Sequence, residues 1–176
     1  MIYRRTAPKI LRFECDAPVL TPILSYNKGL LKNLFGDELQ ERWLNLKRAW
    51  VYAQDWHCKL FTDEGVISIT VKRGAITDFN SIPEVVESIL KRDDRKGFVA
   101  GLVHDAGFAL QALSFQTIND FFYQLHRLEG SGRSKSWLKW RAVSSCFAKK
   151  VWDEGVPSYE SGWYTIQWTD KIDPDI

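Results

Sequence analysis

The sequence lacks the features that mark several common protein classes. No run of about 18 consecutive apolar residues occurs, so a membrane-spanning helix is not expected. The basic N-terminus is followed by no apolar run long enough for a secretory signal peptide. Basic and acidic side chains number 24 and 22, which gives a formal net charge of +2. This near balance carries no strong signal for nucleic-acid binding.

Cysteine is scarce, and the cysteines form no recognisable pair. Cys15, Cys58 and Cys146 are odd in number, lie far apart and show no Cys-x-x-Cys spacing of the kind that binds metals. Disulfides are rare inside cells, where thiols are kept reduced. The simplest interpretation is therefore a reduced, intracellular protein.

The motifs of several well-known enzyme classes are absent as well. The chain contains no glycine-rich phosphate loop, no G-x-S-x-G nucleophile elbow and no H-E-x-x-H zinc motif. No internal repeat is visible. These absences leave the class of any activity open and direct attention to less familiar arrangements of polar residues.

The chain does contain enough apolar side chain for one folded core. Hydrophobic residues make up 45% of its 176 residues, so the bulk of the chain is expected to be ordered. A first strand region over 48–61 and a second over 66–71 flank a turn at 62–65, which predicts a β-hairpin. We expect an α+β fold, in which a small antiparallel sheet built on the hairpin 48–72 packs against three or four helices.

Helical periodicity follows the hairpin in three main segments. Apolar residues recur at helical spacing over 97–112, over 115–128 behind an N-cap at Ser114, and over 135–154. The three predicted helices would supply most of the helical layer.

We divide the chain into a core domain, which contains the hairpin and its helices, and two outlying segments. Residues 48–155 are expected to form the core domain, with 1–47 as an N-terminal extension packed on it and 156–176 as an aromatic and acidic C-terminal tail. Within the extension, residues 19–26 predict a short strand that Pro22 restricts to a sheet edge, because proline lacks an amide hydrogen. Two shorter helices are expected between residues 30 and 47, with a break at Gly36-Asp37, and another is expected over 83–92.

The most informative stretch is an apolar helix that carries a histidine beside an aspartate. In residues 97–112, apolar side chains cover most of the helix circumference, and His104 and Asp105 interrupt them. Burying an imidazole and a carboxylate is costly unless each finds a partner. Either the fold supplies those partners, or a metal ion or a substrate does.

A metal-dependent site is one interpretation of this pair. If the helices pack against the hairpin, Asp78 after the last strand, His104-Asp105 and Asp120 on the next helix converge. Neutral imidazole and carboxylate ligate divalent metal ions, and a bound cation lowers the pKa of its water enough for hydrolysis. We therefore expect a divalent metal ion as cofactor, with these four residues as its ligands and as catalytic residues.

The alternative is that the same residues form a structural polar network. In that arrangement Asp78 caps a turn, and His104 bonds a backbone carbonyl or a carboxylate. The spacing of the residues does not decide between the two interpretations.

Four short motifs, taken in order, resemble a family found mostly in tailed phages and prophages. They are Ile76-Thr77-Asp78-Phe79-Asn80-Ser81-Ile82-Pro83, Leu102-Val103-His104-Asp105, Asp120-Phe121-Phe122 and Trp140-Arg141-Ala142-Val143. The family is catalogued as the domain of unknown function numbered 1353, and the resemblance covers about residues 48–155. The resemblance implies a phage or prophage origin and a shared site. It implies no reaction mechanism, because the family has no settled activity.

The resemblance implies a phage or prophage accessory protein in the cytoplasm of the bacterial host or on the virion. It also implies that Asp78, His104, Asp105 and Asp120 belong to one site. Arg141 matches the last motif. It could form a structural bidentate pair with Asp78 or Asp105, whereas in a hydrolase Arg141 or His126 would assist the site as an acid or anion-binding group.

Two hypotheses of function follow. The first is a small metal-dependent hydrolase that uses this site. The second is a non-enzymatic structural, assembly or host-defence-interaction protein whose phage or host partner contacts the outlying segments. Trp163 and Trp168 near the chain end motivate the second hypothesis, because terminal aromatics cover either a partner surface or the protein's own core.

Overall fold

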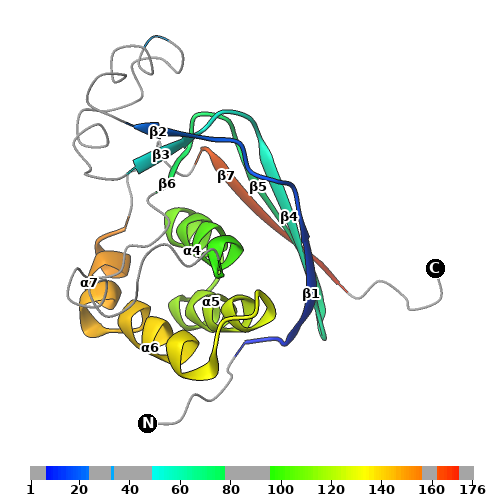
Figure 1. The fold of residues 1–176 in the computed structure, drawn as a ribbon, viewed down its shortest axis with the longest axis vertical. Helices are drawn as coiled ribbons and strands as arrows, with labels where there is room; N and C mark the ends of the chain where they lie inside the picture. The colour runs from blue at the N-terminus through cyan, green and yellow to red at the C-terminus, as the bar shows by residue number, and fades with distance from the viewer. Residues whose placement is uncertain (1–6, 24–32, 34–48, 78–95, 156–161, 171–176) are drawn as a thin grey trace, which may run out of the picture.

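A curved antiparallel sheet, built from strands that are distant in sequence, covers one side of the molecule (Figure 1). The computed structural model describes residues 7–23, 33, 49–77, 96–155 and 162–170. The sheet has four strands in the order β1-β4-β5-β7. Their bounds are Ile10–Cys15 for β1, Trp56–Thr62 for β4, Gly65–Val71 for β5 and Tyr164–Asp170 for β7.

The hairpin of β4 and β5 forms the middle of this sheet. Along β5, Ile67, Ile69 and Val71 are buried, while the intervening Ser68 and Thr70 are only partly so. This alternation follows from the two-residue period of a strand with one face on the core. The turn is closed by Thr62, whose Oγ1 donates to the Gly65 carbonyl at 2.8 Å. The predicted hairpin is therefore confirmed for β4 and β5.

A second sheet of three strands, in the order β2-β3-β6, lies at the top of the view in Figure 1. Pro22 lies on an edge strand of this sheet, as its missing amide hydrogen predicts. The strands are β2 (Leu20–Ile23), β3 (Ala49–Tyr52) and β6 (Ile76–Thr77).

The first strand region predicted over 48–61 is therefore divided between two sheets. The chain leaves β3 after Tyr52 and enters β4 at Trp56. The Tyr52 amide donates to the Ala75 carbonyl at 2.9 Å, and the Gly74 amide donates to the Tyr52 carbonyl at 2.9 Å. These bonds hold β3 against the segment that follows β5, which places β3 in the second sheet.

Two of the predicted helices are present with nearly the predicted bounds. They are α4 (Phe98–Leu110) and α5 (Phe115–Leu128). Ser114 caps α5 as predicted, because its Oγ accepts the Thr117 amide at 3.0 Å.

The third predicted helix, over 135–154, is two helices. They are α6 (Arg133–Val143) and α7 (Cys146–Glu154). The break falls at Ser145, whose Oγ accepts the Ala148 amide at 3.3 Å and starts α7 as its N-cap. A serine that caps a new helix ends the preceding one, because its backbone leaves helical geometry.

The helices lie inside the curve of the sheet. Figure 1 shows α4 and α5 next to the sheet, with α6 and α7 farther from it. The core between α4, α5 and the four-stranded sheet is apolar, and its largest fully buried side chains include Trp56, Phe121, Phe122, Leu60 and Ile67. Among the described residues, two antiparallel sheets and four helices are present, which confirms the predicted α+β class.

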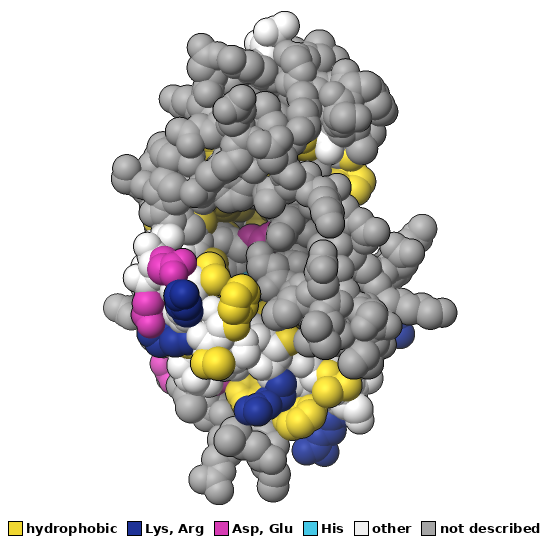
Figure 2. Space-filling model, turned by 90° about the vertical axis from the view of Figure 1, so that its left-hand side faces the viewer, with side chains coloured by type: hydrophobic (Ala, Val, Ile, Leu, Met, Phe, Trp, Pro, Cys, Tyr) yellow, Lys and Arg dark blue, Asp and Glu magenta, His cyan; other side chains and the backbone are white. Residues whose placement is uncertain are grey.

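The outer helices carry apolar side chains at the surface. Figure 2 shows hydrophobic and basic side chains interspersed on the side of the molecule that holds α7. On α7, Phe147 and Val151 are exposed and no residue is fully buried. Within the described part of the chain, no helix is long and apolar enough to cross a membrane.

The predicted N-terminal extension and C-terminal tail both contribute strands to the main sheet. β1 pairs with β4 at one edge, and β7 pairs with β5 at the other. Trp163 packs against the core, whereas Trp168 on β7 is 40% exposed. The helices predicted between residues 30 and 47 and over 83–92 lie outside the described residues, apart from residue 33.

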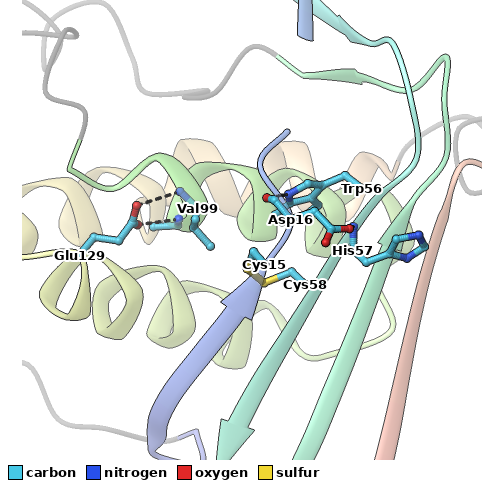
Figure 3. Close-up of a disulfide and its surroundings, with 8 residues drawn as sticks. Cys15, Asp16, Trp56, His57, Cys58, Val99 and Glu129 are labelled. Atoms are coloured by element: carbon cyan, nitrogen blue, oxygen red, sulfur yellow. Dashed lines mark hydrogen bonds between the residues drawn. A yellow bond between two sulfur atoms is a disulfide. The ribbon is translucent and has the colours of Figure 1, made fainter. Parts of the chain in front are cut away.

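The expectation that the cysteines are reduced is wrong for two of them. Cys15 on β1 and Cys58 on β4 form a disulfide, shown in Figure 3. They are directly opposite in the antiparallel pair, with Cα atoms 4.0 Å apart, although 43 positions separate them in sequence. Cys146 is free and exposed. Strand pairing joins cysteines whose spacing in the sequence resembles no disulfide motif.

Candidate functional site

Two of the sequence motifs meet where β6 ends beside α4. Thr77 is the last residue of β6 and is buried, and Asp105 lies in the middle of α4 and is half-buried. Thr77 Oγ1 donates a hydrogen bond to Asp105 Oδ2. The contact joins residues that are 28 positions apart in the chain. It brings the threonine-aspartate motif and the histidine-aspartate motif to one place.

Two buried tyrosines lie near this contact. Tyr52, on β3, is 1% exposed. Burial, with additional effects of Tyr164 and Asp105, raises the pKa of Tyr52 far above its ordinary value, so this phenol is neutral at physiological pH. Tyr164 on β7 is buried, and its hydroxyl donates to the Ile76 carbonyl at 3.0 Å. We call Tyr52, Thr77, Asp105 and Tyr164 the Asp105 site.

His104 lies next to Asp105 in sequence but has different partners. Consecutive side chains on a helix are about 100° apart around its axis. His104 Nε2 donates to Asn119 Oδ1 on α5 at 2.9 Å, and both side chains are buried. The imidazole centroid also lies 4.4 Å from that of Phe108 and 5.0 Å from that of Phe122. His104 therefore links α4 to α5 within an apolar interface.

The protonation state of His104 follows from this environment. Burial lowers its pKa to about 4, although the hydrogen bond with Asn119 acts in the opposite direction. The imidazole is accordingly neutral near pH 7. A neutral ring that donates through Nε2 satisfies the oxygen of Asn119 and introduces no charge between the two helices.

Asp120 binds the N-terminal arm. Its side chain is fully buried, Oδ2 accepts the Ala7 amide at 3.1 Å, and Gln116 Nε2 donates to Oδ1 at 3.3 Å. One turn later, Gln124 Oε1 accepts the Ile10 amide at 2.8 Å. Two side chains of α5 therefore hold the chain that leads into β1.

The two auxiliary candidates lie on other parts of the helical layer. Arg141 is exposed near the end of α6. His126 is fully buried on α5, where its Nδ1 lies 3.4 Å from Ser131 Oγ. A Cβ on Gly97, which has a φ of +96°, would lie 1.6 Å from the His126 ring, so glycine is required there by both space and backbone conformation.

The structure thus separates the predicted site residues into groups. Asp105 meets Thr77, His104 meets Asn119, and Asp120 meets the Ala7 amide. Asp78 lies outside the described residues. Within the described ranges, no three histidine, cysteine, aspartate or glutamate side chains are grouped as a metal site requires.

No motif in the sequence marks Tyr52, Tyr164 or Asn119 as site residues. Tyr52 has only a faint signal, as an aromatic residue in the predicted strand region 48–61. Asn119 directly precedes the motif residue Asp120, and nothing else in the sequence marks it. Tyr164 reaches the site only because β7 pairs with β5, a long-range pairing that local pattern does not reveal.

Comparison with known proteins bears on the same region. A family model described as "Protein of unknown function (DUF1353)" matches residues 50–143, which is more than half of the chain. The matched segment includes Tyr52, Thr77, Asp105 and Asn119, whereas β1, β2 and β7 lie outside it. No curated protein and no solved structure matches the chain significantly. The chain belongs to the DUF1353 family.

Proposed function

We propose that the protein is an accessory protein of a tailed phage or prophage, and that the Asp105 site and the neighbouring Asp78 bind a divalent metal ion and hydrolyse a substrate. The observation that carries the proposal is the hydrogen bond from Thr77 to the half-buried carboxylate of Asp105. Asp78 follows Thr77 directly in the chain. Two motifs of the family are thereby joined at a carboxylate that is only partly covered.

The chemistry of the donors supports a hard cation. Asp78, Asp105 and Thr77 offer oxygen atoms only, and oxygen ligands suit Mg²⁺, Mn²⁺ and Ca²⁺ better than softer metals. When bound, such an ion lowers the pKa of a coordinated water and so supplies a nucleophile. The phenol of Tyr52 is neutral and fully buried, so it adds no charge beside the carboxylate that would compete with Asp105 for the ion.

The other predicted residues have supporting roles in this proposal. His104 holds α4 against α5 through Asn119, and Asp120 holds the N-terminal arm through the Ala7 amide. Both already have protein partners, so the proposed ligand set is narrower than the four residues that the sequence suggests. Their effect on the site is to position α4, which carries Asp105.

The location of the protein follows from the same proposal. Disulfides persist in oxidising surroundings and are rare in the bacterial cytoplasm. The Cys15–Cys58 disulfide therefore favours action on the virion or outside the host cytoplasm. Mass spectrometry of purified virus particles would test this placement, because it shows whether the protein is part of the virion.

Metal binding by variants tests the proposed site. We expect purified wild-type protein to bind about one equivalent of Mn²⁺ in calorimetric titration, and Asp105→Asn and Asp78→Asn to lose that binding while they stay folded. Asp153→Asn, which alters an exposed carboxylate on α7, is the matched control and should bind like wild type. Absence of Mn²⁺, Mg²⁺ and Ca²⁺ binding by wild type, or binding that survives Asp105→Asn, would contradict the proposal.

A specific observation also favours a second, non-enzymatic function. Since His104 and Asp120 have buried partners in Asn119 and the Ala7 amide, part of the predicted site is a structural network. In a phage structural, assembly or host-defence-interaction protein, these residues would need only to stabilise the fold, and no metal ion or substrate would be required. Failure of His104→Ala to fold, together with a wild-type protein that contains no metal, would favour this function.

A further inference from the structure

The two edges of the four-stranded sheet differ in how they discourage pairing with another strand. On β1, Arg12 and Glu14 form an exposed ion pair, and the pairing with β4 is irregular between Ile10 and Arg12. The Arg12 guanidinium also lies 3.6 Å from the centroid of Phe61. Charged side chains and bulges are devices by which proteins protect an edge strand. The β1 edge is therefore protected.

The β7 edge has none of these devices between Thr165 and Thr169. This segment, Thr-Ile-Gln-Trp-Thr, contains no charged residue and no proline, and its ladder with β5 is regular. Trp168 is 40% exposed, and Gln167 and Thr169 are exposed as well. An uncharged, regular edge with an exposed aromatic side chain is an open site for strand addition.

The hydrogen-bond pattern shows which backbone groups this edge presents. The Lys72 amide donates to the Trp163 carbonyl at 2.8 Å, so the pair of residues 72 and 163 is a hydrogen-bonded pair of the ladder. Such pairs alternate along antiparallel strands, and the backbone N–H and C=O groups of Ile166 and Trp168 therefore point away from β5. In the described part of the chain, these groups have no intramolecular partner.

We propose that this edge pairs with β7 of a second copy of the chain, antiparallel and centred on Gln167. In that register Ile166 of one copy lies opposite Trp168 of the other, and the outward-pointing groups of these residues bond each other. Thr165 lies opposite Thr169, and Gln167 lies opposite itself. The segment is thus self-complementary in an antiparallel pairing, and no two like charges meet.

The side-chain pairs in this register are favourable ones. Aromatic–aliphatic and threonine–threonine cross-strand pairs each stabilise antiparallel sheets. Ile166 is partly buried against the core, so the indole of Trp168 from the second copy would extend the same apolar layer. The second copy would then cover the surface of Trp168 that is exposed in the single chain.

The symmetry of this contact limits the assembly to a dimer. Each copy contributes the same strand, so the interface is two-fold and closed. The remaining edge of each sheet is β1, which is protected by Arg12 and Glu14. The two four-stranded sheets would join into one continuous sheet that does not grow further.

A charge-swap experiment at the centre of the register tests the proposal. Gln167 faces itself across the two-fold axis, so Gln167→Lys and Gln167→Glu each place like charges opposite one another. We expect sedimentation velocity to show a wild-type dimer within about 1–100 µM, and each variant to weaken association about tenfold or more. Mixing the two variants in equal amounts should restore the dimer, because lysine then faces glutamate.

The control is the same change on the protected edge. Leu11 on β1 is 54% exposed, and Leu11→Lys should leave the dimer unchanged. A wild-type chain that remains monomeric over this range overturns the proposal and leaves the β7 edge for a strand of another protein. A dimer that persists in both Gln167 variants, or variants that do not recombine when mixed, overturns the β7 register.

Discussion

The Thr77 hydroxyl donates a hydrogen bond to the Asp105 carboxylate, which ties the end of β6 to the middle of α4. Thr77 is 3% exposed, so its hydroxyl has little access to water in place of this partner. The bond is charge-assisted when Asp105 is ionised, and such bonds contribute more than neutral ones. The same contact therefore holds the second sheet to the helical layer and orients the carboxylate of the proposed site.

Removal of this donor should destabilise the fold. Thr77→Val keeps the branched shape but leaves Asp105 without the hydroxyl, and we expect the free energy of unfolding to fall by about 1.5–3 kcal/mol. Thr77→Ser keeps the hydroxyl and should lose less. Urea denaturation followed by circular dichroism measures both. Equal stability of Thr77→Val and wild type would show that the bond contributes nothing in solution.

The stability of the protein should depend on pH through His104. Its pKa in the folded protein, about 4, lies below the ordinary value of 6.5, so folding favours the neutral ring. The corresponding stability is fully present above pH 6.5 and is lost as the pH falls from 6.5 through 4. Over this window we expect a loss of about 3 kcal/mol from this residue.

Variants of the two histidines separate this effect from general acid denaturation. His104→Gln keeps a hydrogen-bond donor toward Asn119 and removes the titration, so its unfolding free energy should change less between pH 7 and pH 4. His57 is exposed, and His57→Gln should retain the full pH dependence of wild type. Identical pH profiles for His104→Gln and wild type would assign the acid sensitivity to other groups.

Glu129 should stabilise the start of α4 from outside that helix. Its Oε1 accepts the Val99 amide and its Oε2 accepts the Ala100 amide, each at 3.0 Å, as Figure 3 shows in part. These amides have no partners within the helix, because they belong to its first turn. We expect Glu129→Ala to lower the free energy of unfolding by about 1–2 kcal/mol.

The pH dependence of the stability that Glu129→Ala loses gives an independent check. Burial raises the pKa of Glu129 above 4.5, although four backbone hydrogen bonds act in the opposite direction. Folding thus favours its protonated form, and its contribution to stability decreases as the pH rises above 4.5. The difference between wild type and Glu129→Ala should shrink over that range. Glu154→Ala, which removes an exposed carboxylate, should show neither effect.

Helices with a clear apolar stripe and a capping residue were predictable from the sequence. The start of α5 was predictable from the capping residue Ser114. The helix α4 was predictable from its nearly continuous apolar residues, which are typical of a buried helix. The break between α6 and α7 was missed, because Ser145 acts as a cap only if the chain bends there. Periodicity continues across the break and does not report that bend.

The site was predictable only in part, since the partners of its residues are distant in sequence. The sequence identified His104 and Asp105 as polar residues in an apolar helix that need partners. It did not predict that Asn119 is the partner of His104 or that Thr77 is the partner of Asp105. These contacts depend on how α5 and β6 pack against α4. Adjacent residues on a helix face different neighbours, so a dipeptide motif does not imply a shared site.

The disulfide gives a prediction about chemistry in solution. Purified without reductant, the folded protein should carry one thiol that reacts rapidly, at Cys146, because Cys15 and Cys58 are bonded to each other. Reduction and unfolding should reveal all 3 cysteines and raise the intact mass by two hydrogens. Replacement of both bonded cysteines by serine should lower the free energy of unfolding by about 2–4 kcal/mol, since the link closes a long loop. Cys146→Ser is the control and should leave stability unchanged, whereas three reactive thiols in the folded, unreduced protein would show that β1 and β4 pair without a covalent bond.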